Sequence, residues 1–349
     1  MTRATACTLA GAAVVVLAGL LAYVHVPYAV RGPGPVCNTL GAPTRSCPAL
    51  DGQHQLISVP PADDHPSASV LALTTVSELD DEPSAATALW YWLHASHAIV
   101  PREVVHPPGV SQQQTERQNT QDMQQAQDDS VVTAESALHL SHAQVASVVP
   151  GSPAASVLAV GDLVLAVNGD EVWNAGQLAV AVHAGTAATA YTLTIRRGTD
   201  TSTVTLHKAT VDGALRLGVG LTTDLSIPVT VNLDPHAIGG PSAGLMFALG
   251  VYDRLTPGNL AGTSVRVAGT GTIDPATGDV GPIGGIQQKM YAARHDFHAR
   301  VFLAPVGDCS DTRGAVPSGL TVVAVSTFQQ ALSVLADVKA GHLTGLPHC

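Results

Sequence analysis

Ser242 and Lys289 are the two residues of this chain whose types and neighbours suit nucleophilic catalysis. Ser242 follows two glycines and a proline in GGPSAGL, and Lys289 follows a second glycine pair in PIGGIQQK. A serine hydroxyl is a weak nucleophile at its ordinary pKa and needs an adjacent base, which a neutral lysine amine can supply. The pair raises the hypothesis of acyl transfer, and the surrounding elements must then bring the two side chains together.

The residues around Ser242 predict the start of a helix. Pro241 suits a first helical turn, and an apolar run continues after Ala243. The first N–H groups of a helix have no partner within it and carry partial positive charge, so they can stabilise an oxyanion. Gly240 lets a substrate backbone approach closely. We therefore expect Gly240, Pro241 and Ala243 to support Ser242.

Two other interpretations of Ser242 stay open at this point. A serine near a helix start is often only a cap for the backbone. Residues 240–244 also fit the G-x-S-x-G elbow of α/β-hydrolases. That elbow needs a downstream acid and then a histidine, for which the candidates are Asp274, Asp308, His342 and His348. The absence of a repeating strand–helix pattern around Ser242 argues against the elbow.

Lys289 can act as a base at neutral pH only if its pKa is strongly lowered. An ordinary lysine has a pKa near 10.4, whereas a base at neutral pH requires about 7–8. The difference of ~3 units corresponds to about 4 kcal/mol, which burial of the ammonium group can supply. Ile286 and Met290 flank Lys289, and no acid lies closer in sequence than Asp279 and Asp296. The sequence therefore predicts a buried lysine.

The composition excludes several classes of function. Acidic residues outnumber basic ones, the net charge is −11, and only 12% of residues are charged. Nucleic-acid binding needs clustered Lys and Arg, so we expect no nucleic-acid partner. The sequence has no G-x-x-x-x-G-K-[ST] motif, no metal-ligand cluster and no dinucleotide fingerprint. We therefore expect no ATP requirement, no metal and no cofactor.

The N-terminal run from Ala6 to Val26 contains no Asp, Glu, Lys or Arg. About 20 apolar residues in a helix cover the ~30 Å hydrocarbon core, so this run predicts an uncleaved membrane anchor over residues 1–26. A cleaved signal peptide is the alternative. We expect a single-pass cell-membrane protein whose catalytic domain is extracytoplasmic.

The cysteines agree with an oxidising compartment. Four of them lie beyond the apolar run, and an even number there suggests disulfides. We expect the pairs Cys37–Cys47 and Cys309–Cys349. The alternative is free thiols.

The segment after the apolar run divides by composition. Residues 27–50 are rich in Pro and Gly and predict an extended stalk. Residues 51–130 predict a small α+β module followed by a polar, Gln-rich linker, and this module has no functional interpretation. A new domain is expected from residue 211 to residue 349.

Residues 131–210 predict a strand, a short helix, a hairpin, a second helix and a second hairpin, and Asn168–Gly169 is a strong turn signal. This order resembles a bacterial PDZ domain. The residues that carry the resemblance are Pro153, Ala154, Ala155, Gly161, Asp162, Asn168 and Gly169. It implies that an extended peptide adds a strand to a sheet edge. The loop that would hold the peptide's carboxylate is expected before the first strand, at Leu138, His139 and Leu140.

GGPSAGL and PIGGIQQK, separated by a strand–turn–strand unit, together resemble the proteolytic domain of Lon proteases. The order of segments resembles the membrane-anchored PDZ–Lon-like proteases of Gram-positive bacteria. The expected fold is therefore α+β and multidomain: an N-terminal transmembrane helix, a small α+β module, a PDZ domain and a C-terminal Lon-type proteolytic domain.

This resemblance also implies roles for single residues. Ser242 matches the nucleophile, Lys289 the general base, and Thr270 the threonine that helps to orient the lysine. ATP-dependent Lon proteases have an acid where this chain has Gly239. We expect ATP-independent cleavage of unfolded or PDZ-presented polypeptides, and the resemblance implies a homo-oligomeric, hexameric ring. The alternative is a catalytically silent, membrane-anchored PDZ adaptor.

Overall fold

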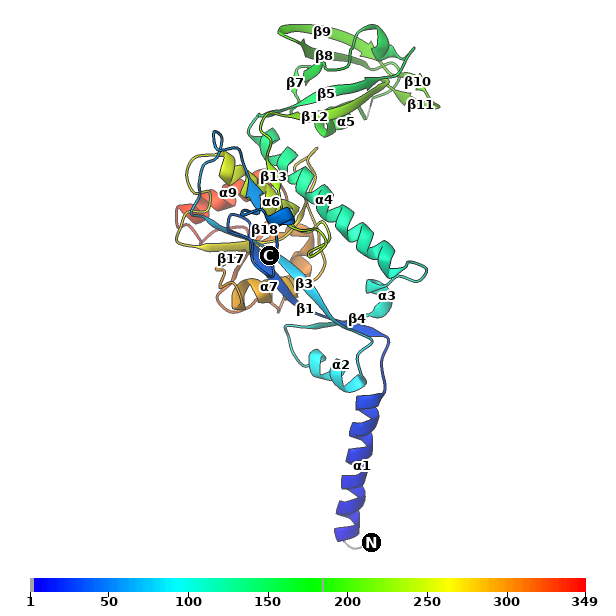
Figure 1. The fold of residues 1–349 in the computed structure, drawn as a ribbon, viewed down its shortest axis with the longest axis vertical. Coiled ribbons are helices and arrows are strands. Elements are labelled where there is room, and N and C mark those ends of the chain that lie inside the picture. Colours follow the sequence, from blue (N-terminus) through cyan, green and yellow to red (C-terminus); the bar gives the residue numbers. More distant parts are fainter. Residues whose placement is uncertain (1–2, 184) are drawn as a thin grey trace.

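The computed structural model describes residues 3–183 and 185–349. Three parts follow one another along the long axis of the molecule in Figure 1. Helix α1 (Arg3–Tyr23) lies at one end, an α/β body in the middle, and a small β-rich domain at the other end. The long helix α4 (Gln112–Ala137) runs along the body and ends at the small domain.

The body is assembled from both ends of the chain. Its elements before α4 are β1 (Tyr28–Asn38), η1 (Leu50–Gly52), β2 (Ile57–Ser58), β3 (Val70–Asp81), α2 (Ala85–Trp92), β4 (Ala98–Pro101) and α3 (Arg102–Val105). Its elements after the small domain are β13 (Thr230–Val231), α6 (Gly244–Leu255), β14 (Arg266–Gly269), β15 (Thr272–Ile273), β16 (Val280–Gly281), α7 (Ile286–His295), β17 (Val301–Pro305), η3 (Val306–Asp308), α8 (Cys309–Thr312), β18 (Thr321–Val325) and α9 (Phe328–Lys339).

A 6-stranded sheet forms the centre of the body, in the order β18-β17-β14-β3-β1-β4. Strands β18, β17, β14 and β3 are parallel, whereas β1 pairs antiparallel with both β3 and β4. Successive strand residues point to opposite faces. Leu303 of β17 packs with Phe247 of α6, and the preceding Phe302 packs with Met290 of α7. Helices α6 and α7 therefore cover opposite faces, and both faces are apolar.

The expected stalk and separate module are not present as such, because residues 27–105 belong to the body. Strand β1 lies inside the central sheet, between β3 and β4. Its prolines favour the prediction of a stalk over that of a strand, because proline has no N–H to donate to a neighbouring strand. Pro33 lies where the register between β1 and β3 shifts, so the sheet accommodates it at an irregularity.

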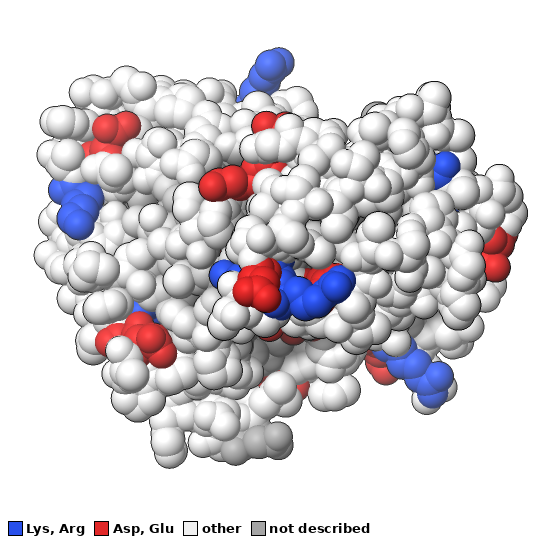
Figure 2. Space-filling view, turned by 90° about the horizontal axis from the view of Figure 1, so that it is seen from above, with Lys and Arg blue, Asp and Glu red and all other residues white. Residues whose placement is uncertain are grey.

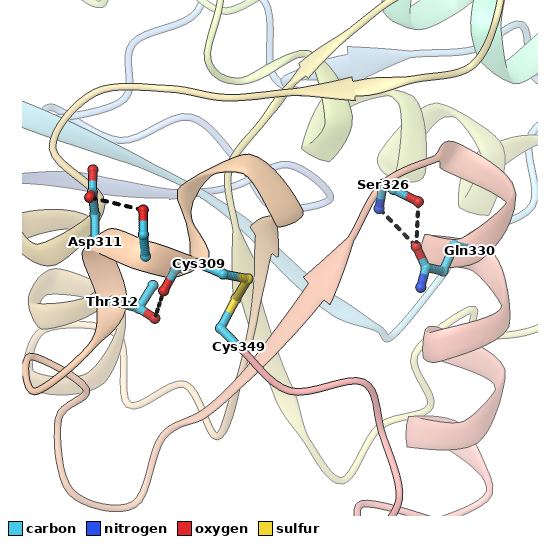
Figure 3. Close-up of a disulfide and its surroundings, with 7 residues drawn as sticks. Cys309, Asp311, Thr312, Ser326, Gln330 and Cys349 are labelled. Atoms are coloured by element: carbon cyan, nitrogen blue, oxygen red, sulfur yellow. Dashed lines mark hydrogen bonds between the residues drawn. A yellow bond between two sulfur atoms is a disulfide. The ribbon is translucent and has the colours of Figure 1, made fainter.

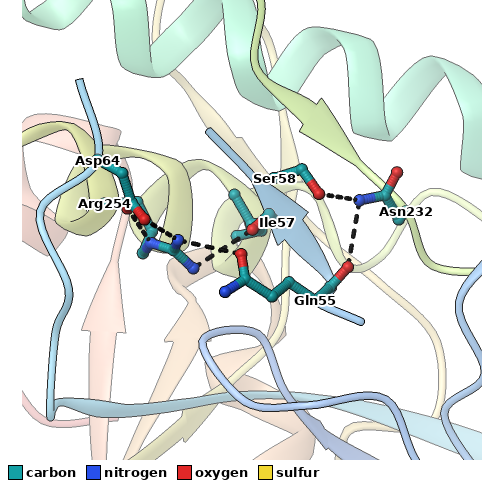
Figure 4. Close-up of polar contacts among 6 residues, drawn as sticks. All are labelled: Gln55, Ile57, Ser58, Asp64, Asn232 and Arg254. Atoms are coloured by element: carbon teal, nitrogen blue, oxygen red, sulfur yellow. Dashed lines mark hydrogen bonds and ion pairs between the residues drawn. The ribbon is translucent and has the colours of Figure 1, made fainter. Parts of the chain in front are cut away.

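Polar contacts tie residues 55–64 to the body as well (Figure 4). The buried guanidinium of Arg254, in the last turn of α6, donates to both carboxylate oxygens of Asp64 at 2.6 Å. It also donates to the carbonyl of Ile57 and to Gln55. The side chain of Asn232 donates to Ser58 Oγ at 2.7 Å. These bonds satisfy a buried cation, as a folded core requires.

The prediction of a transmembrane helix was wrong. No helix in residues 3–183 and 185–349 is both long enough and apolar enough to cross a membrane. The apolar run extends to Val26, but helix α1 ends at Tyr23. His25 then forms a bridge with Ser84, and the N–H of Val26 donates to the carbonyl of Pro83. The helix and the apolar run therefore do not coincide, because the last three residues of the run lie outside α1. Single-pass anchoring in a membrane is therefore not supported.

The polar segment expected as a linker forms the well-capped helix α4. Ser111 and Gln114 make a reciprocal capping box at its start. Met123 and Val131 are buried against the body, so one face of the helix is part of the core.

The small domain spans residues 141–225, rather than 131–210. Its elements are β5 (Ser141–Val148), η2 (Pro153–Ser156), β6 (Leu163–Val167), β7 (Asp170–Glu171), α5 (Ala175–His183), β8 (Ala190–Arg197), β9 (Asp200–His207), β10 (Ala209–Val211), β11 (Ala214–Arg216) and β12 (Val219–Leu225). The sheet order is β12-β5-β6-β8-β9, with β7 beside β6. Strand β12 was missed because it follows the last predicted hairpin, and residues 131–137 belong to α4.

Charged groups are sparse on the molecular surface. Figure 2 looks onto the molecule from above the small domain, and most of this face is uncharged, with a few charged side chains, some of opposite sign side by side near the centre. This distribution agrees with a chain in which only 12% of residues are charged.

Four cysteines form the two expected disulfides. Cys37–Cys47 joins the end of β1 to the following loop, and both residues lie in the core. Cys309–Cys349 fastens the last residue of the chain to the start of α8 (Figure 3). Each bridge holds a segment that contains little secondary structure of its own.

Replacing both Cys37 and Cys47 with alanine is expected to lower the free energy of unfolding by about 2–3 kcal/mol. The bridge closes a short loop, and its loss releases chain entropy in the unfolded state. Urea denaturation of the variant under oxidising conditions measures the change. Wild-type protein in reductant is the control, and an unchanged midpoint in the variant would argue against this bridge.

Candidate active site

Ser242, Thr270 and Lys289 meet at the carboxyl end of β14. The Nζ of Lys289 donates to Ser242 Oγ at 2.8 Å and to Thr270 Oγ1 at 3.0 Å. The hydroxyl of Thr270 in turn donates to the backbone carbonyl of Ser242 at 2.9 Å. Each of the three residues comes from a different segment: before α6, after β14, and within α7. The central sheet therefore brings together residues that are far apart in sequence.

The backbone at Ser242 is fixed, but the helix starts later than expected. Helix α6 begins at Gly244, because the chain first closes a turn in which the N–H of Gly244 bonds to the carbonyl of Pro241. The carbonyl of Ser242 also accepts the N–H of Gly271 at 2.8 Å. Among the described residues, the N–H groups of Ser242 and Ala243 have no hydrogen-bond acceptor. They are free to act as donors to a bound group.

Lys289 is buried, with 2% of its surface exposed. Burial lowers the pKa of Lys289 to about 7, and the nearby carboxyl group of Asp308 opposes this shift. Asp308 accepts the N–H of Ile283 at 3.0 Å, and burial raises its own pKa. Sequence proximity could not identify Asp308, because only the fold brings it close to Lys289.

A glycine places helix α7 against β3. Gly285 has a φ of 70°, and it immediately precedes α7. A Cβ at this position would lie 2.5 Å from Cγ1 of Val76, so a larger residue would displace the helix. The glycine pair before Lys289 thus lets α7 lie close to β3, and this packing sets the position of Lys289 in the site.

Helix α4 packs against the loop of residues 239–243, called the catalytic loop below because it carries Ser242. The N–H of Gly240 donates to the carbonyl of Asn119 at 2.8 Å. A Cβ on Gly239 would lie 2.8 Å from Cβ of Asn119 and 3.3 Å from its carbonyl oxygen. A side chain at position 239 therefore requires a shift of α4 or of the loop that carries Ser242. The Gln-rich sequence of α4 gave no signal for this contact.

Two cavities are lined in part by Ser242. One of about 360 Å³ is lined by Thr74, Met123 and Gly239, and one of about 500 Å³ by Arg31, Thr272 and Pro282. Val76 borders both. A larger trough of about 1140 Å³ continues along the first half of α4. The walls come largely from β1, β3 and α4, elements that sequence reasoning did not assign to the site.

Strand β3 has an unpaired edge next to these cavities. Its pairing with β14 ends at Leu73, which lies opposite Gly269. Residues 74–78 continue past that point and line the smaller cavity. An extended peptide could therefore add to this edge beside Ser242.

The residues expected to hold a peptide carboxylate lie elsewhere. Leu138 is the C-cap residue of α4, and the ring of His139 stacks on that of Trp173, with the ring centroids 4.2 Å apart. The N–H of Leu140 bonds to the carbonyl of Glu135. These three residues form the junction between α4 and the small domain. They do not line the groove of that domain.

The groove of the small domain lies between α5 and β12. Its cavity of about 210 Å³ is lined mostly by apolar residues, including Leu178, Val182 and Leu221. Strand β12 is the edge strand of the sheet, so its outer side can accept another strand. The sequence could not locate this groove, because β12 follows the rest of the domain along the chain.

Comparison with known families supports two assignments. Residues 144–197 match the family model of the PDZ domain, and residues 223–337 match that of the Lon protease (S16) C-terminal proteolytic domain. Ser242, Thr270 and Lys289 all lie in the second match. A comparison with curated proteins found no match.

Two solved structures are similar to the small domain. The PDZ domain of an SdrC-like protein from Listeria monocytogenes is 21% identical, with a TM-score of 0.22, and the match covers 23% of this chain and 86% of that chain. The PDZ domain of an SdrC-like protein from Listeria innocua is 18% identical, with a TM-score of 0.22, and the match covers 23% of this chain and 92% of that chain. The family matches confirm the expected pair of domains: the chain carries a PDZ domain and a Lon-type C-terminal proteolytic domain, which is a peptidase domain.

Proposed function

We propose that this protein is an ATP-independent serine endopeptidase in which Ser242 is the nucleophile and Lys289 the general base. The observation that carries the proposal is the 2.8 Å hydrogen bond between Lys289 Nζ and Ser242 Oγ at a buried amine. Burying an unpaired ammonium group costs folding free energy. The lowered pKa that results allows the amine to act as a base at neutral pH.

The expected reaction has two stages. Neutral Lys289 takes the proton of Ser242, whose oxygen attacks the peptide carbonyl carbon. The N–H groups of Ser242 and Ala243, which have no acceptor among the described residues, are the expected donors for the oxyanion that forms. The lysinium then returns its proton to the leaving amine. A water molecule, activated by the same lysine, releases the acyl group and regenerates Ser242.

Thr270 is expected to position the lysine. Its hydroxyl accepts a bond from Lys289 Nζ and donates one to the carbonyl of Ser242. The threonine therefore sets the direction of the amine relative to the nucleophile.

The substrate is expected to be an extended polypeptide. The free edge of β3 lies at a cavity that Ser242 also lines, and the two cavities that Ser242 lines give room for substrate residues. A strand can bind there through its backbone with little sequence selectivity. Folded proteins do not present such strands, so unfolded or loosely structured chains are the expected substrates.

Peptidase activity is expected to rise with pH through about 7. Only neutral Lys289 can accept the serine proton, and its pKa is lowered by burial to about 7. Below that value, kcat/KM should fall about tenfold per pH unit. A pH–rate profile on an unstructured peptide measures the inflection. A profile that is flat between pH 5.5 and 8.5 would contradict the role of Lys289 as base.

Purified protein incubated with an unfolded polypeptide tests the function itself. Wild type should degrade it equally with and without ATP, whereas Ser242→Ala should not degrade it. Equal degradation by both proteins would show that another residue, or a contaminant, is responsible. A folded wild-type protein without any activity would favour the silent PDZ adaptor.

A further inference from the structure

We propose that Asp308 is a positioning residue of the peptidase site, which holds the segment in front of helix α7 and thereby fixes the place of Lys289. This inference rests on the proposed peptidase function and adds to it the residue that acts on the base. Three observations carry it: where the sheet places Asp308, what its carboxylate holds, and how a disulfide ties the segment that contains it.

The central sheet brings Asp308 to the edge that carries the candidate site. Strands β14 and β17 are parallel neighbours, so their carboxyl ends lie at the same edge of the sheet. Thr270 follows β14, and its N–H donates to the carbonyl of Leu303 in β17 at 3.1 Å. Asp308 ends the short helix η3, which follows β17 directly, and only 5% of its surface is exposed. Strand pairing therefore places a buried acid next to the site.

The carboxylate of Asp308 holds the segment of residues 282–285. Its Oδ2 accepts the N–H of Ile283 at 3.0 Å. The adjacent Gly307 approaches Pro282, so that a Cβ added to the glycine would lie 3.4 Å from that of the proline. Pro282 and Ile283 line the cavity of about 500 Å³ at the candidate site. The hydrogen bond therefore fixes one wall of this cavity.

The same segment sets the position of Lys289. Gly285 immediately precedes α7, and its carbonyl accepts the N–H of Lys289 at 3.1 Å. In the first turn of the helix, Gln287 donates through Nε2 to the carbonyl of Asp311 at 2.9 Å. Bonds from Asp308 and Asp311 thus hold the chain on both sides of Gly285. A displacement of about 1 Å near reacting groups costs of the order of 10²-fold in rate, so this hold bears directly on proton transfer.

The charge of Asp308 also acts on the protonation of Lys289. An amide could accept the same backbone N–H without the cost of burying a carboxylate. Burial lowers the pKa of Lys289 to about 7, and the carboxylate of Asp308 opposes this shift. Burial raises the pKa of Asp308, and Asp311 acts in the same direction. Arg31 and Glu78 are charged residues that line the cavities at Lys289 as well. The carboxylate of Asp308 therefore stabilises the lysinium that forms during the reaction.

A disulfide ties the segment that contains Asp308 to the central sheet. Cys309 follows Asp308 directly and is bonded to Cys349 (Figure 3). The adjacent His348 forms a bridge with Val323 of β18, so this end of the chain is anchored to the sheet. The disulfide thus limits the movement of Asp308, and its removal should weaken the hold on the base.

Two replacements of Asp308 in the full-length protein test the proposal on an unstructured peptide. Asp308→Ala removes the acceptor and should lower kcat at pH 8 about tenfold, as the loss of a hydrogen bond to a charged group does. Asp308→Asn keeps an acceptor and should keep kcat within about threefold of wild type. The inflection of its pH–rate profile should move to lower pH, because no carboxylate then raises the pKa of Lys289. Asp296→Asn, at an exposed acid that caps the end of α7, is the control and should match wild type in both measurements.

The outcomes separate this proposal from the peptidase function. Equal kcat in wild type and Asp308→Ala would overturn the positioning role, as would a loss in Asp308→Asn as large as that in Asp308→Ala. An inflection in Asp308→Asn at the wild-type pH would overturn it as well. A folded but inactive wild type would instead overturn the peptidase function.

Removal of the disulfide tests the same hold while Asp308 stays in place, and so decides even if Asp308→Ala does not fold. Replacing Cys309 and Cys349 with alanine should lower kcat about threefold, whereas replacing Cys37 and Cys47 should leave it unchanged. Adding Asp308→Ala to the first pair should cost less than the product of the two separate losses, because both changes act on one segment. Unchanged kcat in the first pair, or losses that multiply, would overturn the proposal.

Discussion

Lys289→Met is expected to lower kcat/KM for polypeptide cleavage by about 10³-fold and to make the folded protein more stable at pH 6. Methionine keeps the length and the apolar stem of the side chain but cannot accept a proton from Ser242. General-base catalysis contributes about 10²–10⁴-fold, and the nucleophile here has no other base within hydrogen-bond distance among the described residues. Initial rates at pH 8 measure the loss.

The gain in stability follows from the pKa of the lysine. In the unfolded chain its pKa is near 10.5, and burial lowers it to about 7 in the folded state. Between these values the unfolded state binds more protons, so wild-type stability rises with pH across this window. Below pH 7 the folded state carries the full free-energy cost of burying the charged lysine, on the order of 5 kcal/mol. Methionine removes it, so the difference between the variants should shrink from pH 6 towards pH 10.

Lys339→Met is the matched control for this substitution. Lys339 is an exposed lysine at the end of α9, so its replacement should leave activity unchanged and should not remove the rise of stability between pH 7 and pH 10. If Lys289→Met retained wild-type activity, the amine would have no role as a base. If Lys289→Met were less stable than wild type at pH 6, the burial of a charged lysine would not be the main free-energy cost at this position.

Gly239→Asp is expected to lower peptidase activity by about 10²-fold, although it restores the acid that ATP-dependent Lon proteases have at this position. The added Cβ would lie 2.8 Å from Cβ of Asn119, so either α4 or the catalytic loop must move. The same loop donates the N–H of Gly240 to Asn119 and carries Ser242. A shift of about 1 Å at a nucleophile costs of the order of 10²-fold. Kinetics on a short peptide measure the effect.

A double-mutant cycle separates this steric effect from the effect of the charge. Gly239→Ala should lower activity for the same reason as Gly239→Asp, and adding Asn119→Gly should restore part of it, because the closest contact is then removed. Asn119→Gly alone should cost only about 1 kcal/mol of stability, as glycine in a helix does. If Gly239→Ala were fully active, the close approach of α4 would not constrain the loop.

The sequence singled out the residues that meet in the candidate site, but not the elements that surround them. Ser242 and Lys289 could be singled out because each lies in a short motif, and the glycines and proline of these motifs have a structural role that local sequence reveals. Asp308 and Asn119 have no such local signal, because their roles depend on contacts between distant segments. The same holds for Val76, which comes from a strand that sequence analysis assigned to a separate module.

The errors in the fold have physical causes of the same kind. Pro33 interrupts the alternation of β1, so an interior strand resembled a stalk. The apolar run at the N-terminus suggested a membrane span, but its last residues leave the helix and pair with the body. The loop that would hold a peptide carboxylate was expected at Leu138, His139 and Leu140, but these residues lie where α4 meets the small domain, and the edge strand β12 comes last in that domain. Periodicity describes single segments and cannot give the order in which strands pair.

Identification of the residue that carries the acyl group tests the central claim most directly. Wild-type protein is treated with a fluorophosphonate, which reacts with activated serines, and peptide mapping by mass spectrometry locates the adduct. The dyad predicts one adduct on Ser242 in wild type, none in Ser242→Ala, and strongly slowed labelling in Lys289→Met. An adduct on another serine, or equal labelling of wild type and Lys289→Met, would contradict the proposed dyad.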